Sequence, residues 1–213
     1  MKRSYHLLLA LVLFGSLELK AQKLGIDLGL KVGANFSQIS GDYWENGYKA
    51  NLLGGVFLGV NGPKLGVQIE GIFSQSTYVA GQGFNELYSD YFNMGKDSIQ
   101  GGSFKVNYLS IPLLLNIKLF PMVKIQAGPQ YSGVVGVKDK EQLLKDATEL
   151  FKSGSFDGVV GISVDFPARI SAGARYIVGL SNINEQDGAA AAGQVSDAWR
   201  QKSLQVHVGY RLF

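Results

Sequence analysis

Apolar and polar residues alternate along most of this chain with a period of two. The pattern is clearest over residues 109–119, where one set of alternate positions is wholly apolar: Leu109, Ile111, Leu113, Leu115, Ile117 and Leu119. Ser110, Asn116 and Lys118 are among the residues between them. Because successive side chains on a β-strand point to opposite faces, this segment predicts a strand with one apolar face and one polar face.

Seven further segments show the same alternation, although residues 50–60 are rich in glycine and less regular. They cover residues 24–35, 50–60, 64–78, 123–132, 160–166, 169–181 and 204–212. In most of them the second face carries glycine, serine or charged residues. The sequence therefore predicts eight β-strands.

The connections between these strands alternate in length, and this alternation predicts the topology. Three are tight turns, at residues 61–63, 120–122 and 166–168, and each contains a proline. Four are long and polar, at residues 36–49, 79–103, 137–157 and 182–200. Short periplasmic turns and long extracellular loops are the plan of an outer-membrane barrel. We therefore expect an all-β fold, an eight-stranded antiparallel up-and-down transmembrane β-barrel with both termini in the periplasm.

The composition of the polar face indicates which face is outside. It contains Glu70, Lys118, Lys124, Asp165, Arg175 and Arg211 among many small residues, and it is too poor in Lys and Glu to resemble a solvated protein surface. We therefore expect the apolar face to contact lipid and the charges to line the lumen. A soluble periplasmic lipocalin-like barrel, which would carry a small hydrophobic ligand, inverts these faces and is the alternative fold.

One segment departs from strand character. Between residues 138 and 152, apolar residues recur at helical spacing among charged ones, at Leu143, Leu144, Ala147, Leu150 and Phe151. This pattern predicts a short amphipathic helix in the third long loop.

The N-terminus has the features of a secretory signal peptide. Lys2 and Arg3 precede an apolar run from Leu7 to Leu17, which is too short to span a bilayer. We expect residues 1–21 to be the signal peptide and residues 22–213 to be the barrel domain. Removing the leader takes away three basic residues and one acidic residue, which leaves 17 basic and 16 acidic residues and a net charge of +1. Such a charge gives no support for nucleic-acid binding.

Residues 107–115, with the sequence Asn-Tyr-Leu-Ser-Ile-Pro-Leu-Leu-Leu, resemble the signature strand of the PorT-like outer-membrane β-barrel family of Bacteroidota. The Ala21-Gln22 junction and the ending Gly209–Phe213 are similar to that group as well. The resemblance implies an outer-membrane location and a barrel fold. It also implies that Phe213 is the assembly signal, read by the outer-membrane assembly machinery, although Phe213 is out of phase with the lipid-facing series of Tyr210 and Leu212.

The sequence offers little material for catalysis or metal binding. After signal cleavage the chain has one histidine, His207, and it has no cysteine, so we expect no catalytic residue, metal site or cofactor. We expect the lumen residues to form a structural polar network, because eight strands enclose just enough space for side chains. This network comprises Glu70, Lys118, Lys124, Asp165, Arg175, His207 and Arg211.

These observations favour a non-enzymatic role at the cell envelope, structural or based on interactions, which includes an accessory role in a secretion or transport assembly. An outer-membrane lipid-modifying enzyme is the alternative in a different functional class. The expected partners are outer-membrane lipid, the assembly machinery during biogenesis and, through the extracellular loops, another envelope protein. We expect a monomer that binds no nucleic acid.

Overall fold

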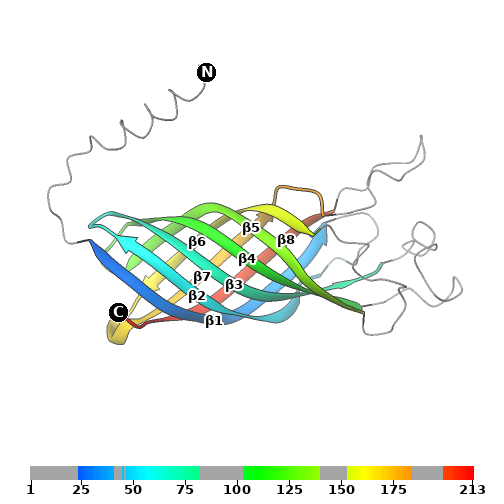
Figure 1. Cartoon of the computed structure of the whole chain (residues 1–213), viewed down its shortest axis with the longest axis horizontal. Coiled ribbons are helices and arrows are strands. Elements are labelled where there is room, and N and C mark those ends of the chain that lie inside the picture. The colour runs from blue at the N-terminus through cyan, green and yellow to red at the C-terminus, as the bar shows by residue number, and fades with distance from the viewer. Residues whose placement is uncertain (1–23, 41–44, 46, 82–102, 140–152, 184–198) are drawn as a thin grey trace, which may run out of the picture.

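The computed structural model describes residues 24–40, 45, 47–81, 103–139, 153–183 and 199–213, and its strands close into one barrel (Figure 1). The eight strands are β1 (Gly25–Ser40), β2 (Lys49–Asn61), β3 (Leu65–Val79), β4 (Ser103–Lys118), β5 (Val123–Asp139), β6 (Gly154–Asp165), β7 (Ile170–Gly179) and β8 (Arg200–Arg211). Each strand pairs antiparallel with its neighbours in sequence, and β1 closes the barrel by pairing antiparallel with β8. The predicted fold is confirmed.

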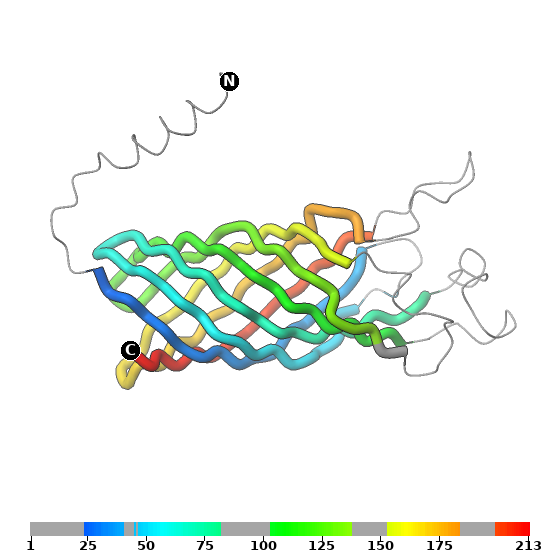
Figure 2. Tube along the Cα trace, viewed as in Figure 1, coloured from blue at the N-terminus to red at the C-terminus, as the bar shows by residue number. Residues whose placement is uncertain are grey.

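The three short turns lie at one end of the barrel, together with the C-terminus (Figure 2). We call this the turn end, and the opposite end, from which the four long connections leave, the loop end. The turns are closed by backbone hydrogen bonds, such as Gly62 N to Leu65 O at 2.7 Å and Phe166 N to Ile170 O at 2.8 Å. Between β6 and β7 the chain makes a 3-10 turn, Pro167–Arg169, in which Ala168 and Arg169 have positive φ angles of 61° and 64°.

The two faces of the strands have the predicted orientation. On β4, Leu109, Leu113 and the alternate residues in series with them are exposed on the outside of the barrel, whereas Ser110 and Asn116 are buried in the lumen. An apolar outer wall is what a hydrocarbon environment requires, since it cannot satisfy exposed polar groups. A lipocalin-like carrier needs the reverse arrangement, so that alternative fold is wrong.

Several strands are longer than a bilayer requires. A crossing takes about 9–11 tilted residues, and the apolar outward series on β4 begins only at Leu109, six residues after the strand begins. The strands therefore continue past the apolar band at the loop end. Exposed aromatic residues mark both edges of the band: Tyr131 and Phe156 stack edge to face at 5.2 Å towards the loop end, and Phe120 and Phe166 lie in the turns. Such girdles are typical of membrane barrels.

Two details differ from the expectations. The helix predicted over residues 138–152 lies largely outside the described residues, but its first two positions, 138 and 139, are the last residues of β5. The phase conflict at Phe213 is resolved because β8 ends at Arg211, so Phe213 lies beyond the ladder and its side chain is exposed. Residues 1–21, for which we predict a signal peptide, also lie outside the described part of the chain. Among the described residues, no helix is long and apolar enough to cross a membrane.

Candidate functional site in the barrel lumen

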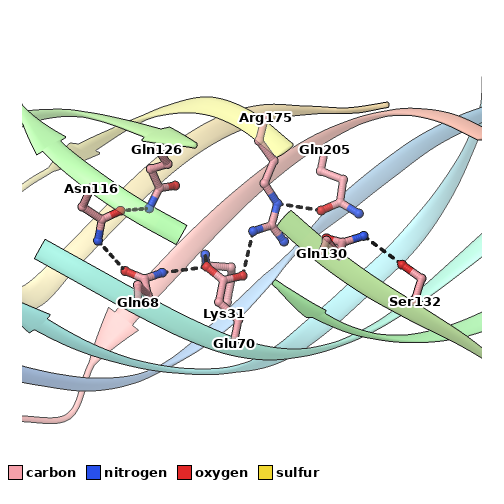
Figure 3. A network of polar contacts seen from close by, with 9 residues as sticks. All are labelled: Lys31, Gln68, Glu70, Asn116, Gln126, Gln130, Ser132, Arg175 and Gln205. Atoms are coloured by element: carbon pink, nitrogen blue, oxygen red, sulfur yellow. Dashed lines mark hydrogen bonds and ion pairs between the residues drawn. The ribbon is translucent and has the colours of Figure 1, made fainter. Parts of the chain in front are cut away.

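Three charged side chains meet at the centre of the lumen. Glu70 on β3 accepts from Lys31 Nζ at 2.5 Å through Oε1 and from Arg175 Nη1 at 2.7 Å through Oε2. Lys31 on β1 and Arg175 on β7 reach it from different sides of the barrel (Figure 3), and Arg175 Nε also donates to Gln205 Oε1 at 2.8 Å. All of these side chains are buried. We call Lys31, Glu70 and Arg175 the central triad.

A row of amide side chains continues from the triad along the inner surface of the barrel, over three neighbouring strands. Gln68 Nε2 donates to Glu70 Oε1 at 2.6 Å, and Asn116 Nδ2 donates to Gln68 Oε1 at 3.2 Å. Gln126 Nε2 then donates to Asn116 Oδ1 at 2.8 Å (Figure 3). Because these side chains come from β3, β4 and β5, the network fastens neighbouring strands to each other from the inside.

A second polar cluster surrounds Asp157 on β6. Its Oδ2 accepts from Ser132 Oγ at 2.7 Å and from Gln130 Nε2 at 3.3 Å, and its Oδ1 accepts from Ser155 Oγ at 3.4 Å. Ser110 Oγ donates to Ser132 Oγ at 3.0 Å. Among the described residues no Lys, Arg or His forms an ion pair with Asp157, so hydrogen bonds alone compensate for its burial.

His207 is buried on the lumen side of β8, where its register neighbours are Gly33 on β1 and Gly173 on β7. A Cβ at residue 173 would lie 2.8 Å from His207 Nε2, so the glycine leaves the space that the imidazole fills. His207 Nδ1 has no hydrogen-bond partner within the described part of the chain. A catalytic histidine of a hydrolase is oriented by a hydrogen bond to an acid or amide at this nitrogen, and the described residues supply none here.

The remaining predicted lumen residues lie at the turn end. Lys124 Nζ is 2.9 Å from Asp165 Oδ2, whereas Arg211 Nη1 is 3.8 Å from Asp27 Oδ2. Lys118 Nζ donates to the carbonyl of Gly62 at 3.1 Å. The structure thus brings together Glu70 with Arg175 and Lys124 with Asp165. Lys118 and Arg211 lie apart from the central triad, whereas His207 borders the same small space as Lys31 without an ion pair to the triad.

The free space in the lumen differs between the turn end and the central triad. A cavity of about 300 Å³ lies at the turn end and is lined by turn residues and charged side chains, including Lys118, Lys124 and Arg211. The next space inward, which borders Lys31, Phe57 and His207, measures only about 10 Å³. This volume is about the minimum for one water molecule, so the described side chains leave little free space at this side of the central network.

Sequence reasoning did not include Lys31 or Asp157 in the polar network. Lys31 lies on the polar face of the first predicted strand, and this position is the signal for it. Asp157 falls at the end of the third predicted loop, residues 137–157, whereas it lies on β6 in the structure. The lumen also contains apolar side chains at positions that belong to the polar face. The ring centroid of Phe57 lies 5.5 Å from Lys31 Nζ, and Leu114 packs in a cluster with Val159 and Ile177. A period-of-two pattern has no signal for such residues.

Comparison with known proteins agrees with this architecture. Residues 20–185 match the family model described as an outer membrane protein beta-barrel domain. The chain belongs to this family. It is therefore an outer-membrane protein, and its turn end is the periplasmic end. A search of curated proteins gives no significant match.

Several solved structures match this outer-membrane protein at low sequence identity. Neisserial surface protein A is 13% identical, covers 88% of this chain and 99% of its own, and has a TM-score of 0.49. Ail of Yersinia pestis, in complex with the heparin analogue sucrose octasulfate, is 10% identical, covers 88% of this chain and 99% of its own, and has a TM-score of 0.49. The outer membrane enzyme PagL is 12% identical, covers 84% of this chain and 98% of its own, and has a TM-score of 0.40.

Proposed function

We propose that this outer-membrane protein is a non-enzymatic, monomeric barrel with a structural or interaction role at the cell envelope. The observation that carries the proposal is the filled lumen, in which the central triad and its amide row occupy the space that a channel would need. A barrel that neither conducts nor catalyses contributes through its surface and its loops. Among the described residues, the strand ends at the loop end continue past the apolar band and carry the four long connections.

The state of His207 supports the non-enzymatic assignment. Hydrolysis on a barrel requires a histidine that is oriented by a third group and is accessible to the lipid substrate. His207 is only 4% exposed, its side chain is in the lumen, and its Nδ1 lacks a partner among the described residues. Lipid on the outside of the barrel is separated from the imidazole by the strand itself.

The test of this assignment compares a deletion strain complemented with wild-type protein or with His207→Gln. We expect both proteins to restore any envelope defect equally and to leave the lipid A and phospholipid profiles unchanged by mass spectrometry. Loss of a modified lipid species on deletion, restored by wild-type protein but not by His207→Gln, would establish the lipid-modifying alternative instead.

We further propose that the protein binds a partner in the envelope at its extracellular end, as an accessory subunit of a secretion or transport assembly would. The exposed Tyr48 precedes β2 at that end, and the exposed Phe120 lies in a periplasmic turn. A photo-crosslinking residue at position 48 should yield a discrete heterologous adduct in cells, whereas the same residue at position 120 should not. Adducts of identical pattern at both positions, or at neither, would contradict the proposal.

A further inference from the structure

The cavity at the periplasmic end of the lumen is positively charged. We call it the periplasmic vestibule, and its charged residues are Asp27, Lys118, Lys124, Asp165 and Arg211. Three cations face two carboxylates, so the vestibule has a net charge of +1. A concave site with one excess sign of charge and low-dielectric walls concentrates ions of the opposite sign.

The excess charge is concentrated on two lysines. Lys118 on β4 and Lys124 on β5 are direct register partners, and both side chains are on the lumen side. Cross-strand partners have Cβ atoms about 4.5–5.5 Å apart, and like charges at such positions are destabilising. Asp165 forms an ion pair with Lys124, whereas the hydrogen bond of Lys118 goes to a neutral carbonyl. One positive charge of the lysine pair is therefore uncompensated.

The third cation comes from the opposite side of the barrel, since β8 is four strands away from β4 in the closed ring. Arg211 is held loosely: its Nη1 is 3.8 Å from Asp27 Oδ2, and this same oxygen accepts a shorter bond, 2.7 Å, from Asn61 Nδ2. Arg211 Nε has no hydrogen-bond acceptor among the described residues. The guanidinium therefore retains donor capacity that its protein partners do not use.

The vestibule is large enough for a small molecule. Its volume of about 300 Å³ accommodates a phosphate or carboxylate with some of its carrier, whereas the next space inward, of about 10 Å³, is too small for either group. An anion that enters from the periplasm would therefore stay between the lysine pair and Arg211.

We propose that the periplasmic vestibule binds a small oxyanion, a phosphate or carboxylate group, through Lys118, Lys124 and Arg211. The bound group offsets the repulsion within the lysine pair and accepts the unused hydrogens of Lys118 and Arg211. Charge-assisted hydrogen bonds of this kind are among the stronger ones in proteins. The ligand is either a free periplasmic anion or the phosphate headgroup of a lipid in the periplasmic leaflet.

The test uses the purified barrel in a zwitterionic detergent, titrated with inorganic phosphate at constant ionic strength and followed by amide chemical shifts. We expect saturable shifts confined to the three periplasmic turns. Lys118→Gln and Arg211→Gln should each weaken the affinity about tenfold. Lys105→Gln is the matched control, because Lys105 is on the same strand, opposite another lysine, but near the loop end.

Shifts that stay linear with phosphate concentration, or an equal loss of affinity in the Lys105 control, would show general screening of charge and overturn the proposal. Folding is checked separately by heat-modifiable electrophoretic mobility, which Lys118→Gln should retain because it removes a repulsion. The source of the anion is distinguished in nanodiscs: weaker phosphate binding in phosphatidylglycerol than in phosphatidylcholine supports a headgroup ligand, and equal binding supports a free anion.

Discussion

Glu70 is the anion on which the buried charges of the lumen depend, so Glu70→Gln is the most informative perturbation. The substitution keeps the size and one acceptor oxygen, but it removes the negative charge between Lys31 and Arg175. Neither cation has another carboxylate partner among the described residues. Both charges would remain buried without compensation.

The magnitude follows from the two ion pairs. Opposite charges with centres about 4 Å apart attract by about 4 kcal/mol at an effective dielectric constant of about 20, which gives about 8 kcal/mol for the two pairs. In the wild type, the cost of desolvating the three ions offsets much of this Coulomb attraction. In the variant the cost of desolvating the two cations remains, but the attraction to Glu70 is lost. Removing one partner of a buried ion pair typically costs about 3–5 kcal/mol, and we expect a loss in that range.

The assay is reversible urea unfolding of the barrel in lipid vesicles, monitored by tryptophan fluorescence, with the heat-modifiable mobility shift as an independent measure. Glu45→Gln is the control, because Glu45 is exposed and has no ion pair in the described structure. Adding Lys31→Met to Glu70→Gln should recover part of the loss, since one buried cation is then removed. A Glu70→Gln protein within about 0.5 kcal/mol of wild type would refute the argument that the triad stabilises the barrel.

Three further predictions concern the turn, the lumen and the lipid-facing wall. Ala168→Gly should raise the free energy of unfolding by up to about 1 kcal/mol, because φ of 61° costs an alanine about that much; unchanged or lower stability in the urea assay would contradict this. Gly173→Ala should lower the free energy of unfolding by about 1–3 kcal/mol, because the new methyl group overlaps with the imidazole of His207. The same substitution should cost less stability in a His207→Ala background. Leu113→Arg, near the middle of the apolar series on β4, should cost about 2–4 kcal/mol in lipid vesicles, whereas a cost near zero would place this position outside the hydrocarbon.

The amino-acid sequence by itself determined the fold class. A strict period of two, with turns and loops in alternation, specifies strands, their approximate number and their antiparallel order, because each of these is a local property of the chain. Hydrophobicity also specified which face contacts lipid. The polar face on Leu109–Leu119 contains Asn116 and Lys118, and both are in the lumen as the pattern predicts.

Only the tertiary structure decided how the lumen residues are paired. Lys31, Glu70 and Arg175 come from three strands that are not neighbours in the barrel, and barrel closure and strand stagger bring their ends together. Alternation gives the face of a residue but not its height along the barrel axis. For this reason the sequence analysis places the predicted lumen charges in one network, whereas the structure separates a central triad, an Asp157 cluster and a periplasmic vestibule.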